Sequence, residues 1–198
     1  MASVMMLAGG YSLVAGLLKL RDPAIVLTVA NSDPAGSDAD LQLSRRLSAA
    51  RAAAVAPHSR MVRVEATFEI GLALFTLYAT AAVLLRDRHG RRLALGVGAL
   101  GIAYQLGTLP VYMSLMRDYA ARGADLLAQL VIQSAAGGTA APDAAEVANR
   151  LRSAIVGGPV VVTTLSVAGS LVLLAFFGGR RGRALYGIDG PPSTRPGT

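Results

Sequence analysis

Two carboxylates spaced one helical turn apart are the residues of this chain best placed to do chemistry. Glu65 and Glu69 stand at the start of a long apolar run, where a helix would place both on one face. An acid inside hydrocarbon is costly and is by default a candidate functional group, so the pair could bind a cation or relay a proton. If the helix begins near Met61, both acids instead lie in the headgroup layer and form salt bridges with Arg60 and Arg63. We favour this structural alternative.

Gln105 is the third candidate for an intramembrane polar site. It lies in another apolar run, where its amide must find a partner away from lipid. It could hydrogen-bond a neighbouring helix or face a ligand cavity, and we favour the first. Tyr112, beside Pro110 near the outer end of the same run, is expected to anchor the helix at the membrane interface.

No pattern in the sequence indicates an enzyme. Cysteine is absent, which excludes disulfides, thiolate nucleophiles and cysteine metal sites. His58 and His89 fall in different loops and are not expected to share a metal. Gly96, Gly98 and Gly101 form a G-x-G-x-x-G string, but inside an apolar run rather than after a strand, so a dinucleotide site is not expected. We predict no catalytic residue, cofactor or metal.

The apolar residues are clustered into runs long enough to cross a bilayer. The chain is 53% hydrophobic and 16% charged, with a mean hydropathy of +0.49, whereas soluble domains are roughly 25% charged. A membrane-spanning helix needs about 20 apolar residues. The sequence predicts an all-α integral membrane bundle of about four transmembrane helices with extramembrane amphipathic helices. The expected spans are residues 2–20, 64–85, 93–116 and 159–178.

Residues 1–186 are expected to form a single four-helix transmembrane domain, followed by a disordered tail over 187–198. Outer helical segments are predicted over residues 37–56 and 117–156. The first run lacks a preceding positive region, so we expect it to be retained rather than cleaved as a signal peptide.

Each outer segment contains a distinct sequence pattern, an apolar stripe in the first and a Gly-Gly-Pro sequence in the second. In the first, a stripe of apolar residues predicts an amphipathic helix that lies on the membrane or against the bundle. The stripe consists of Leu43, Leu47, Ala50 and Ala54. In the second, the Gly-Gly-Pro sequence over residues 157–159 predicts a break or kink.

Small residues recur at spacing four in two of the spans. They are Ala8, Ser12 and Gly16 in the first span, and Ala99, Ala103 and Gly107 in the third. Such stripes let helix backbones approach closely, and packing drives helix association in lipid. The spacing leaves open whether they join helices within one chain or between chains.

The formal net charge of +7 is concentrated beside the spans. Residues 86–92 hold four arginines and residues 180–183 hold three, and an even number of spans separates the two clusters. The positive-inside rule therefore puts both clusters and both termini in the cytoplasm. The link over residues 86–92 is short enough to force an antiparallel hairpin. Eighteen arginines against one lysine suggest a bacterial genome, and hence a bacterial inner membrane.

The stretch Ala15-Gly16-Leu17-Leu18-Lys19-Leu20-Arg21-Asp22-Pro23 resembles the end of the first helix in DoxX/MauE-like small four-helix membrane proteins. The long polar insert that follows departs from that pattern. The link over residues 86–92 is similar to those of small bacterial four-helix membrane proteins of unknown role. Neither resemblance implies a function.

The expected function is that of a non-catalytic accessory or scaffold component that packs through small-residue helix faces. The alternative is a small ion- or proton-coupled transporter that uses Glu69 and Gln105. The expected partners are the lipid bilayer and either another membrane protein or a second copy of the chain. Nucleic acid is not expected, because no basic face is interleaved with aromatic residues.

Overall fold

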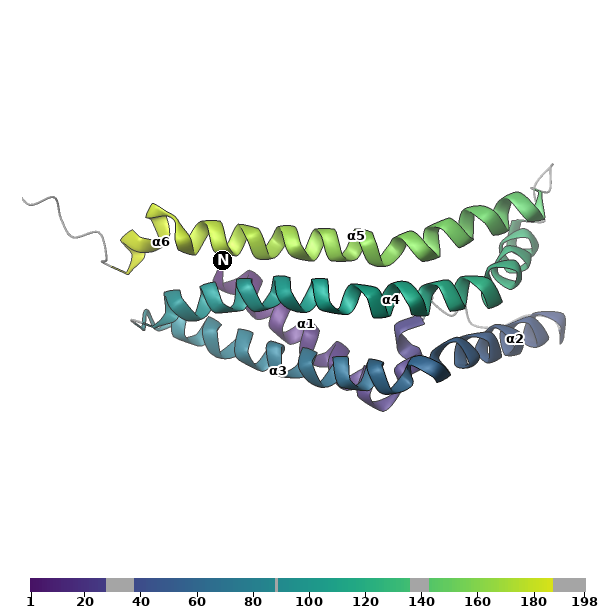
Figure 1. The fold of residues 1–198 in the computed structure, drawn as a ribbon, viewed down its shortest axis with the longest axis horizontal. Helices are drawn as coiled ribbons and strands as arrows, with labels where there is room; N and C mark the ends of the chain where they lie inside the picture. The colour runs from purple at the N-terminus through teal and green to yellow at the C-terminus, as the bar shows by residue number, and fades with distance from the viewer. Residues whose placement is uncertain (28–37, 88, 136–142, 187–198) are drawn as a thin grey trace, which may run out of the picture. The chain divides into compact units, whose positions relative to one another are not determined.

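The protein is described by a computed structural model that covers residues 1–27, 38–87, 89–135 and 143–186. Every regular element in these ranges is a helix, which confirms the predicted all-α class (Figure 1). The α-helices are α1 (Ala2–Arg21), α2 (Asp38–Val55), α3 (Ser59–Leu84), α4 (Gly90–Ala135), α5 (Ala144–Gly178) and α6 (Arg180–Leu185). Two short 3-10 helices, η1 (Pro23–Leu27) and η2 (Ala56–His58), flank α2. The predicted tail over 187–198 lies outside the described residues.

Four helical stretches are long and apolar enough to cross a membrane. They are Ala2–Arg21, Leu41–Leu84, Gly90–Gln133 and Ala144–Gly178. Each overlaps one of the four predicted spans, the second ending one residue short of residue 85, and the last three stretches are much longer than the roughly 20 residues that a bilayer requires. The four apolar helices indicate a membrane protein.

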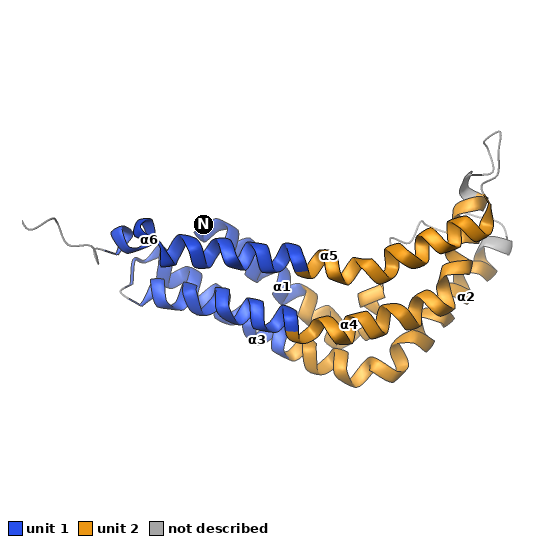
Figure 2. Ribbon diagram, turned by 45° about the horizontal axis from the view of Figure 1, so that its top comes forward, with its two compact units in different colours: residues 1–14, 68–106, 164–198 blue, residues 15–67, 107–163 orange. Residues whose placement is uncertain are grey.

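The chain divides into two compact units (Figure 2). Unit 1 comprises residues 1–14, 68–106 and 164–198, and unit 2 comprises residues 15–67 and 107–163. Helices α1, α3, α4 and α5 each contribute one segment to either unit. The two units are described separately below.

The core of unit 1 is small and is surrounded by exposed apolar side chains. Its buried residues are Met5, Ala79, Ala94, Val97 and Phe177. Large apolar side chains on the outside of the same unit include Tyr78, Leu100, Leu165, Leu171 and Val172. An apolar exterior of this kind is unusual for a water-soluble domain and fits a surface that contacts lipid.

Glycines bring the helices of unit 1 close together. A Cβ atom added at Gly9 of α1 would lie 3.1 Å from the Leu77 side chain of α3. A Cβ atom at Gly98 of α4 would lie 2.9 Å from Leu174 Cγ of α5, and one at Gly101 would lie 2.9 Å from Ser170 Oγ. Close packing between α4 and α5 therefore depends most on glycine at position 98, since the Ser170 hydroxyl near Gly101 can rotate away.

The predicted small-residue stripes are only partly buried. In the first span Gly16 is buried and Ser12 is half-buried, while Ala8 is exposed. In the third span the three predicted residues, Ala99, Ala103 and Gly107, are all exposed. Within unit 1 the close approach to α5 instead uses Gly98 and Gly101. Packing between chains through the exposed stripe stays a prediction.

The core of unit 2 joins η1 and α2 to α3 and α4. Its buried residues are Leu27, Ala54, Val55, Val62, Leu115 and Tyr119. On α2, Leu43 and Ala54 are buried while Arg45 and Arg46 are exposed. Helix α2 also packs against η1 and η2. Of the two alternatives for this amphipathic helix, the structure supports packing against the protein.

Helix α1 ends where the sequence provides a stop. Pro23 disfavours helical backbone at the residue before it, so α1 ends at Arg21. The carboxylate of Asp22 then accepts a hydrogen bond from the Ala24 backbone N–H at 2.9 Å and caps the first turn of η1. This stop fixes Lys19 in the last turn of α1.

Of the break or kink predicted at residues 157–159, the break is wrong, because α5 continues from Ala144 to Gly178 with Pro159 inside it; a kink there stays a prediction. Proline removes one backbone donor, but an apolar environment leaves the remaining backbone groups no partner except one another. Helix α4 likewise continues through Pro110 to Ala135. The predicted outer segment after residue 117 is therefore a direct continuation of the third span.

The antiparallel hairpin predicted over residues 86–92 is confirmed within unit 1 (Figures 1 and 2). The Asp87 N–H donates to Ala82 O at 2.9 Å and the Arg86 N–H donates to Val83 O at 3.2 Å. These two bonds form a Schellman motif, in which the residue after the C-cap adopts a left-handed conformation. Arg86 takes that position with a φ of 53°.

Substituting Arg86→Gly is therefore expected to stabilise the protein by about 1 kcal/mol, because the left-handed conformation is strained for a residue with a Cβ atom. The measurement is the free energy of unfolding in detergent micelles. The exposed Arg92, which lies inside α4, is the matched control. Arg92→Gly should destabilise by about 1 kcal/mol, since glycine lowers helix propensity there.

Candidate functional site

Glu65 is buried in unit 2 and is paired with a lysine and a tyrosine. Its side chain is 7% exposed, and Lys19 Nζ lies 3.2 Å from its Oε1 atom. The Tyr112 hydroxyl donates a hydrogen bond to Glu65 Oε2 at 2.8 Å. Lys19 Nζ in turn donates to Tyr112 Oη at 2.8 Å. We call these three residues the Lys19–Glu65–Tyr112 cluster.

Three helices position the cluster. Lys19 is in the last turn of α1, where a cation interacts favourably with the helix dipole. Glu65 lies in the second turn of α3, which begins at Ser59, and Tyr112 lies in α4. The long aliphatic stem of Lys19 lets its ammonium group reach the other two side chains while the stem covers apolar surface.

The cluster contains one positive and one negative charge, so the charge on Glu65 is compensated inside the protein. Burying an ion pair is costly unless additional hydrogen bonds satisfy it, and the Tyr112 hydroxyl supplies such a bond to each partner. The arrangement can hold α1, α3 and α4 in one register. Loss of Lys19 would remove the ammonium group that lies 3.2 Å from the buried Glu65 carboxylate.

The three predicted site residues fall in two helices, with Glu65 and Glu69 one turn apart in α3 and Gln105 in α4. Glu65 belongs to the cluster in unit 2, whereas Glu69 and Gln105 are half-buried residues of unit 1, each with interactions of its own. Helix α3 begins at Ser59, ahead of Met61, so Glu65 lies near the start of the helix. A position of the two acids in the headgroup layer stays a prediction.

The sequence did not identify the partners of Glu65. We expected salt bridges to Arg60 and Arg63, but both of these are exposed, and Glu65 pairs with Lys19. Tyr112 was expected to be only an interface anchor. One signal was available, since the single lysine of the chain stands at the end of an apolar run.

Two further side-chain contacts between helices lie in unit 2. His58 Nε2 and Asp118 Oδ2 are 2.8 Å apart, which ties η2 to α4. Arg152 Nη2 lies 3.4 Å from Asp125 Oδ1 and so connects the outer parts of α5 and α4. The Arg152–Asp125 pair is 45% and 71% exposed, so it contributes little stability, roughly 0–1 kcal/mol.

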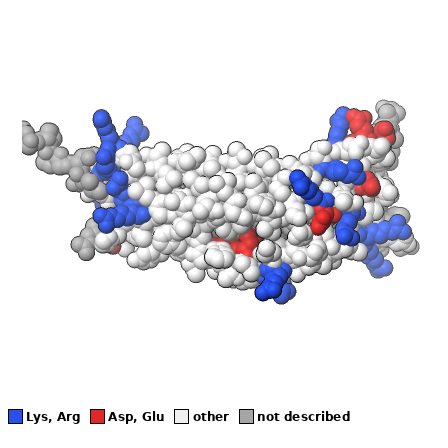
Figure 3. Space-filling model, in the orientation of Figure 1, with Lys and Arg blue, Asp and Glu red and all other residues white. Residues whose placement is uncertain are grey.

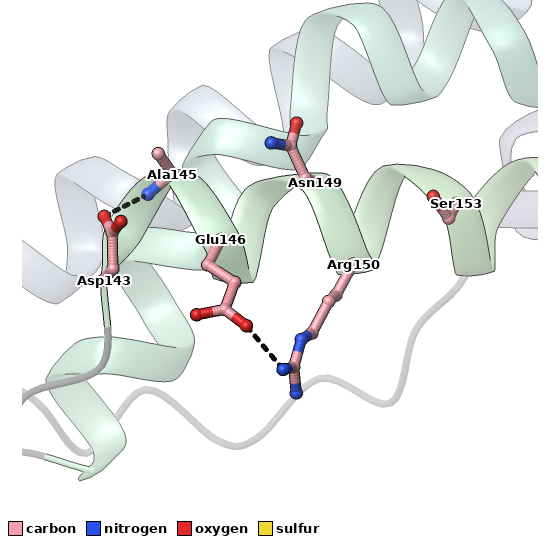
Figure 4. A pocket seen from close by; sticks show the side chains of 6 residues that line it. All are labelled: Asp143, Ala145, Glu146, Asn149, Arg150 and Ser153. Atoms are coloured by element: carbon pink, nitrogen blue, oxygen red, sulfur yellow. Dashed lines mark hydrogen bonds and ion pairs between the residues drawn. The ribbon is translucent and has the colours of Figure 1, made fainter.

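A shallow hollow lies beside the first turns of α5 (Figure 4). It is lined by Asp143, Ala145, Glu146, Asn149, Arg150 and Ser153. Asp143 Oδ1 accepts a hydrogen bond from the Ala145 N–H and caps the helix, while Glu146 pairs with Arg150 one turn later. All lining residues are exposed and come from one short stretch, so this hollow lacks the walls of a ligand site.

Among the described residues, no group of three or more His, Asp and Glu side chains could hold a metal ion.

Tyr119 is unusual because it buries a polar group without a hydrogen bond. It is 2% exposed in the core of unit 2, and its hydroxyl has no hydrogen-bond partner in the structure. A buried hydroxyl without a partner costs roughly 1–3 kcal/mol.

Substituting Tyr119→Phe is expected to leave stability unchanged or to raise it by about 1 kcal/mol, because the substitution removes the unpaired hydroxyl and keeps the ring. Tyr112→Phe, the matched change in the same helix, should lower stability by about 1–2 kcal/mol since it removes two hydrogen bonds. Chemical unfolding of both variants in the same detergent compares them. Equal effects of the two substitutions would contradict the assigned contacts.

No family model, curated protein or solved structure matches the chain. The likeness of residues 15–23 to DoxX/MauE-like proteins therefore remains a local resemblance.

Proposed function

We propose that this chain is a multi-pass bacterial inner-membrane protein that acts as a non-catalytic accessory or scaffold component. Unit 2 would contact a protein partner outside the bilayer. The main support is the length of α4. It has 46 residues, whereas about 20 are enough to cross a bilayer, so a large part of the helix would extend outside the membrane. Leu127 in the outer part of α4 and Ile155 in α5 pack against the core formed with Ala54 and Val55 of α2. Such a core gives the extramembrane helices a defined surface.

The Lys19–Glu65–Tyr112 cluster supports a structural role rather than catalysis or transport. Its carboxylate has a lysine partner 3.2 Å away and is only 7% exposed. A carboxylate that carries a cation or proton must exchange partners during each cycle. A cluster whose three side chains bond one another across three helices instead favours a fixed arrangement.

Both arginine-rich segments support an orientation with cytoplasmic termini. Arg91 Nε donates a hydrogen bond to Phe177 O at 2.7 Å, so the α3–α4 link and the end of α5 are neighbours within unit 1. Two clusters on one side of a membrane satisfy the positive-inside rule together.

Site-directed crosslinking tests the scaffold proposal. The native chain has no cysteine, so Gln129→Cys in the outer part of α4 introduces a single thiol at an exposed position. A short bifunctional maleimide should give a discrete protein adduct in membranes, and mass spectrometry would identify either another protein or a second copy. Tyr78→Cys on the apolar face of unit 1 is the control and should give none. Equal adducts at both positions would reject a partner surface on unit 2.

Ion- or proton-coupled transport is the second candidate, favoured by the half-buried carboxylate of Glu69 within an apolar span. Reconstituted vesicles that contain the wild-type chain should then carry a proton or cation flux that Glu69→Gln abolishes. Glu146→Gln, on the exposed surface of α5, is the matched control. Flux that is absent from the wild-type vesicles would reject transport.

A further inference from the structure

Six arginines from two distant segments gather at one end of unit 1. Figure 3 shows these basic side chains beside α6, next to a stretch of surface without charge. They are Arg86, Arg91 and Arg92 from the α3–α4 hairpin, and Arg180, Arg181 and Arg183 from α6. We call them the arginine patch. Asp87 is an acid of the same hairpin.

Backbone contacts fix the two halves of the patch against each other. Arg91 Nε donates to Phe177 O, near the end of α5, at 2.7 Å. A Cβ atom at Gly182 would lie 2.6 Å from Phe176 O, so only glycine lets α6 fold back onto the end of α5. A Cβ atom at Gly90 would lie 2.9 Å from the Tyr186 hydroxyl, so the start of α4 touches the residue after α6.

The electrostatics of Tyr186 agree with this proximity. Its partial burial raises the pKa of the phenol, and the nearby Asp87 carboxylate raises the pKa further. The hairpin and α6 therefore form one surface. Orientation by positive charge needs arginines near a span end, but it does not need two segments locked together.

The arginine patch combines two kinds of chemistry. Arg92, Arg180 and Arg181 are exposed, and guanidinium groups bind phosphate oxygens in pairs. Next to the arginines in the chain stand three exposed leucines: Leu84 (62% exposed), Leu85 (81%) and Leu185 (57%). A free phosphate would use only the charges. A ligand with a phosphate and hydrocarbon chains uses both.

We propose that the arginine patch binds the headgroups of anionic phospholipids, with Leu84, Leu85 and Leu185 against the acyl chains. Basic clusters directly beside a span are suited to anionic lipid of the cytoplasmic leaflet. The inference rests on the proposed membrane location but not on the scaffold role.

Thermal unfolding of the detergent-purified full chain tests this inference. Phosphatidylglycerol at about ten times its dissociation constant should raise the unfolding midpoint by about 4 °C. Phosphatidylcholine with the same acyl chains and inorganic phosphate should leave the midpoint unchanged. Native mass spectrometry should then detect bound phosphatidylglycerol.

Matched variants localise the effect. The triple variant Arg92→Gln/Arg180→Gln/Arg181→Gln should lose most of the shift. The control replaces three exposed arginines of unit 2 by glutamine, Arg45, Arg46 and Arg150, and should keep it. Arg92→Lys/Arg180→Lys/Arg181→Lys keeps the charge and should retain part of the shift, which guards against misfolding of the glutamine variant.

Three results would overturn the inference. The first two are a rise of the unfolding midpoint with phosphatidylcholine, or with inorganic phosphate, as large as the rise with phosphatidylglycerol. The third is a unit 2 control variant that loses as much of the phosphatidylglycerol shift as the triple glutamine variant of the arginine patch. A chain that stays monodisperse without detergent would instead reject the membrane location, so the two failures are distinguishable.

Discussion

Lys19→Met is expected to lower the free energy of unfolding by about 3–5 kcal/mol, because it removes the ammonium group that lies 3.2 Å from the buried Glu65 carboxylate. Lys19 and Glu65 are 16% and 7% exposed, so water does little to screen the loss. The free energy of unfolding is measured in mixed micelles. A denaturing detergent is titrated in, and circular dichroism monitors the loss of helix. Arg21→Met, at an exposed basic residue of the same helix end, should change stability by less than about 0.5 kcal/mol.

A double variant separates the charge effect from lost packing. Lys19→Met/Glu65→Gln removes both charges and should recover most of the stability that Lys19→Met loses. Replacing both members of a buried ion pair by neutral residues often leaves the free energy of unfolding nearly unchanged. If Lys19→Met behaved like Arg21→Met, the cluster would not be a buried ion pair.

Gly98→Leu is expected to destabilise the protein by about 3 kcal/mol, because a side chain at this position overfills the α4–α5 contact. A Cβ atom would already lie 2.9 Å from Leu174 Cγ and 3.2 Å from Ser170 O, and the backbone oxygen cannot rotate away. The same unfolding measurement applies.

Gly107→Leu, on the same helix, is the control for Gly98→Leu. Nothing lies within 4 Å of a Cβ atom at Gly107, so its effect on the unfolding of the monomer should be below about 0.5 kcal/mol. A larger loss at Gly107 than at Gly98 would contradict the packing of α4 described above.

The fold was predictable where backbone physics alone decides it. Apolar runs of bilayer length must satisfy their backbone groups internally, which is why a long helix covers each of the four predicted spans, the second to within one residue. The hairpin between α3 and α4 followed from the shortness of its link. The same physics explains the wrong prediction at Pro159, because an apolar environment preserves a helix that proline would break in water.

The candidate site was less predictable because it depends on helix rotation. The spacing of Glu65 and Glu69 predicts that both lie on one face of a helix. It does not predict which neighbouring helix packs against that face. Lys19 is 46 positions away in the chain and reaches Glu65 only through the packing of α1 against α3. Glycine spacing has the same limit, because the chain contains 22 glycines and their order does not tell Gly98 from Gly107.

Thiol labelling at two positions tests most directly whether the chain crosses the membrane with its arginine patch inside. Single cysteines replace His89 in the α3–α4 hairpin and Asp143 before α5, both exposed, and no native thiol competes. In intact cells an impermeant maleimide should label position 143 at once and position 89 only after permeabilisation. Equal labelling of both positions, or the reverse order, would contradict the account.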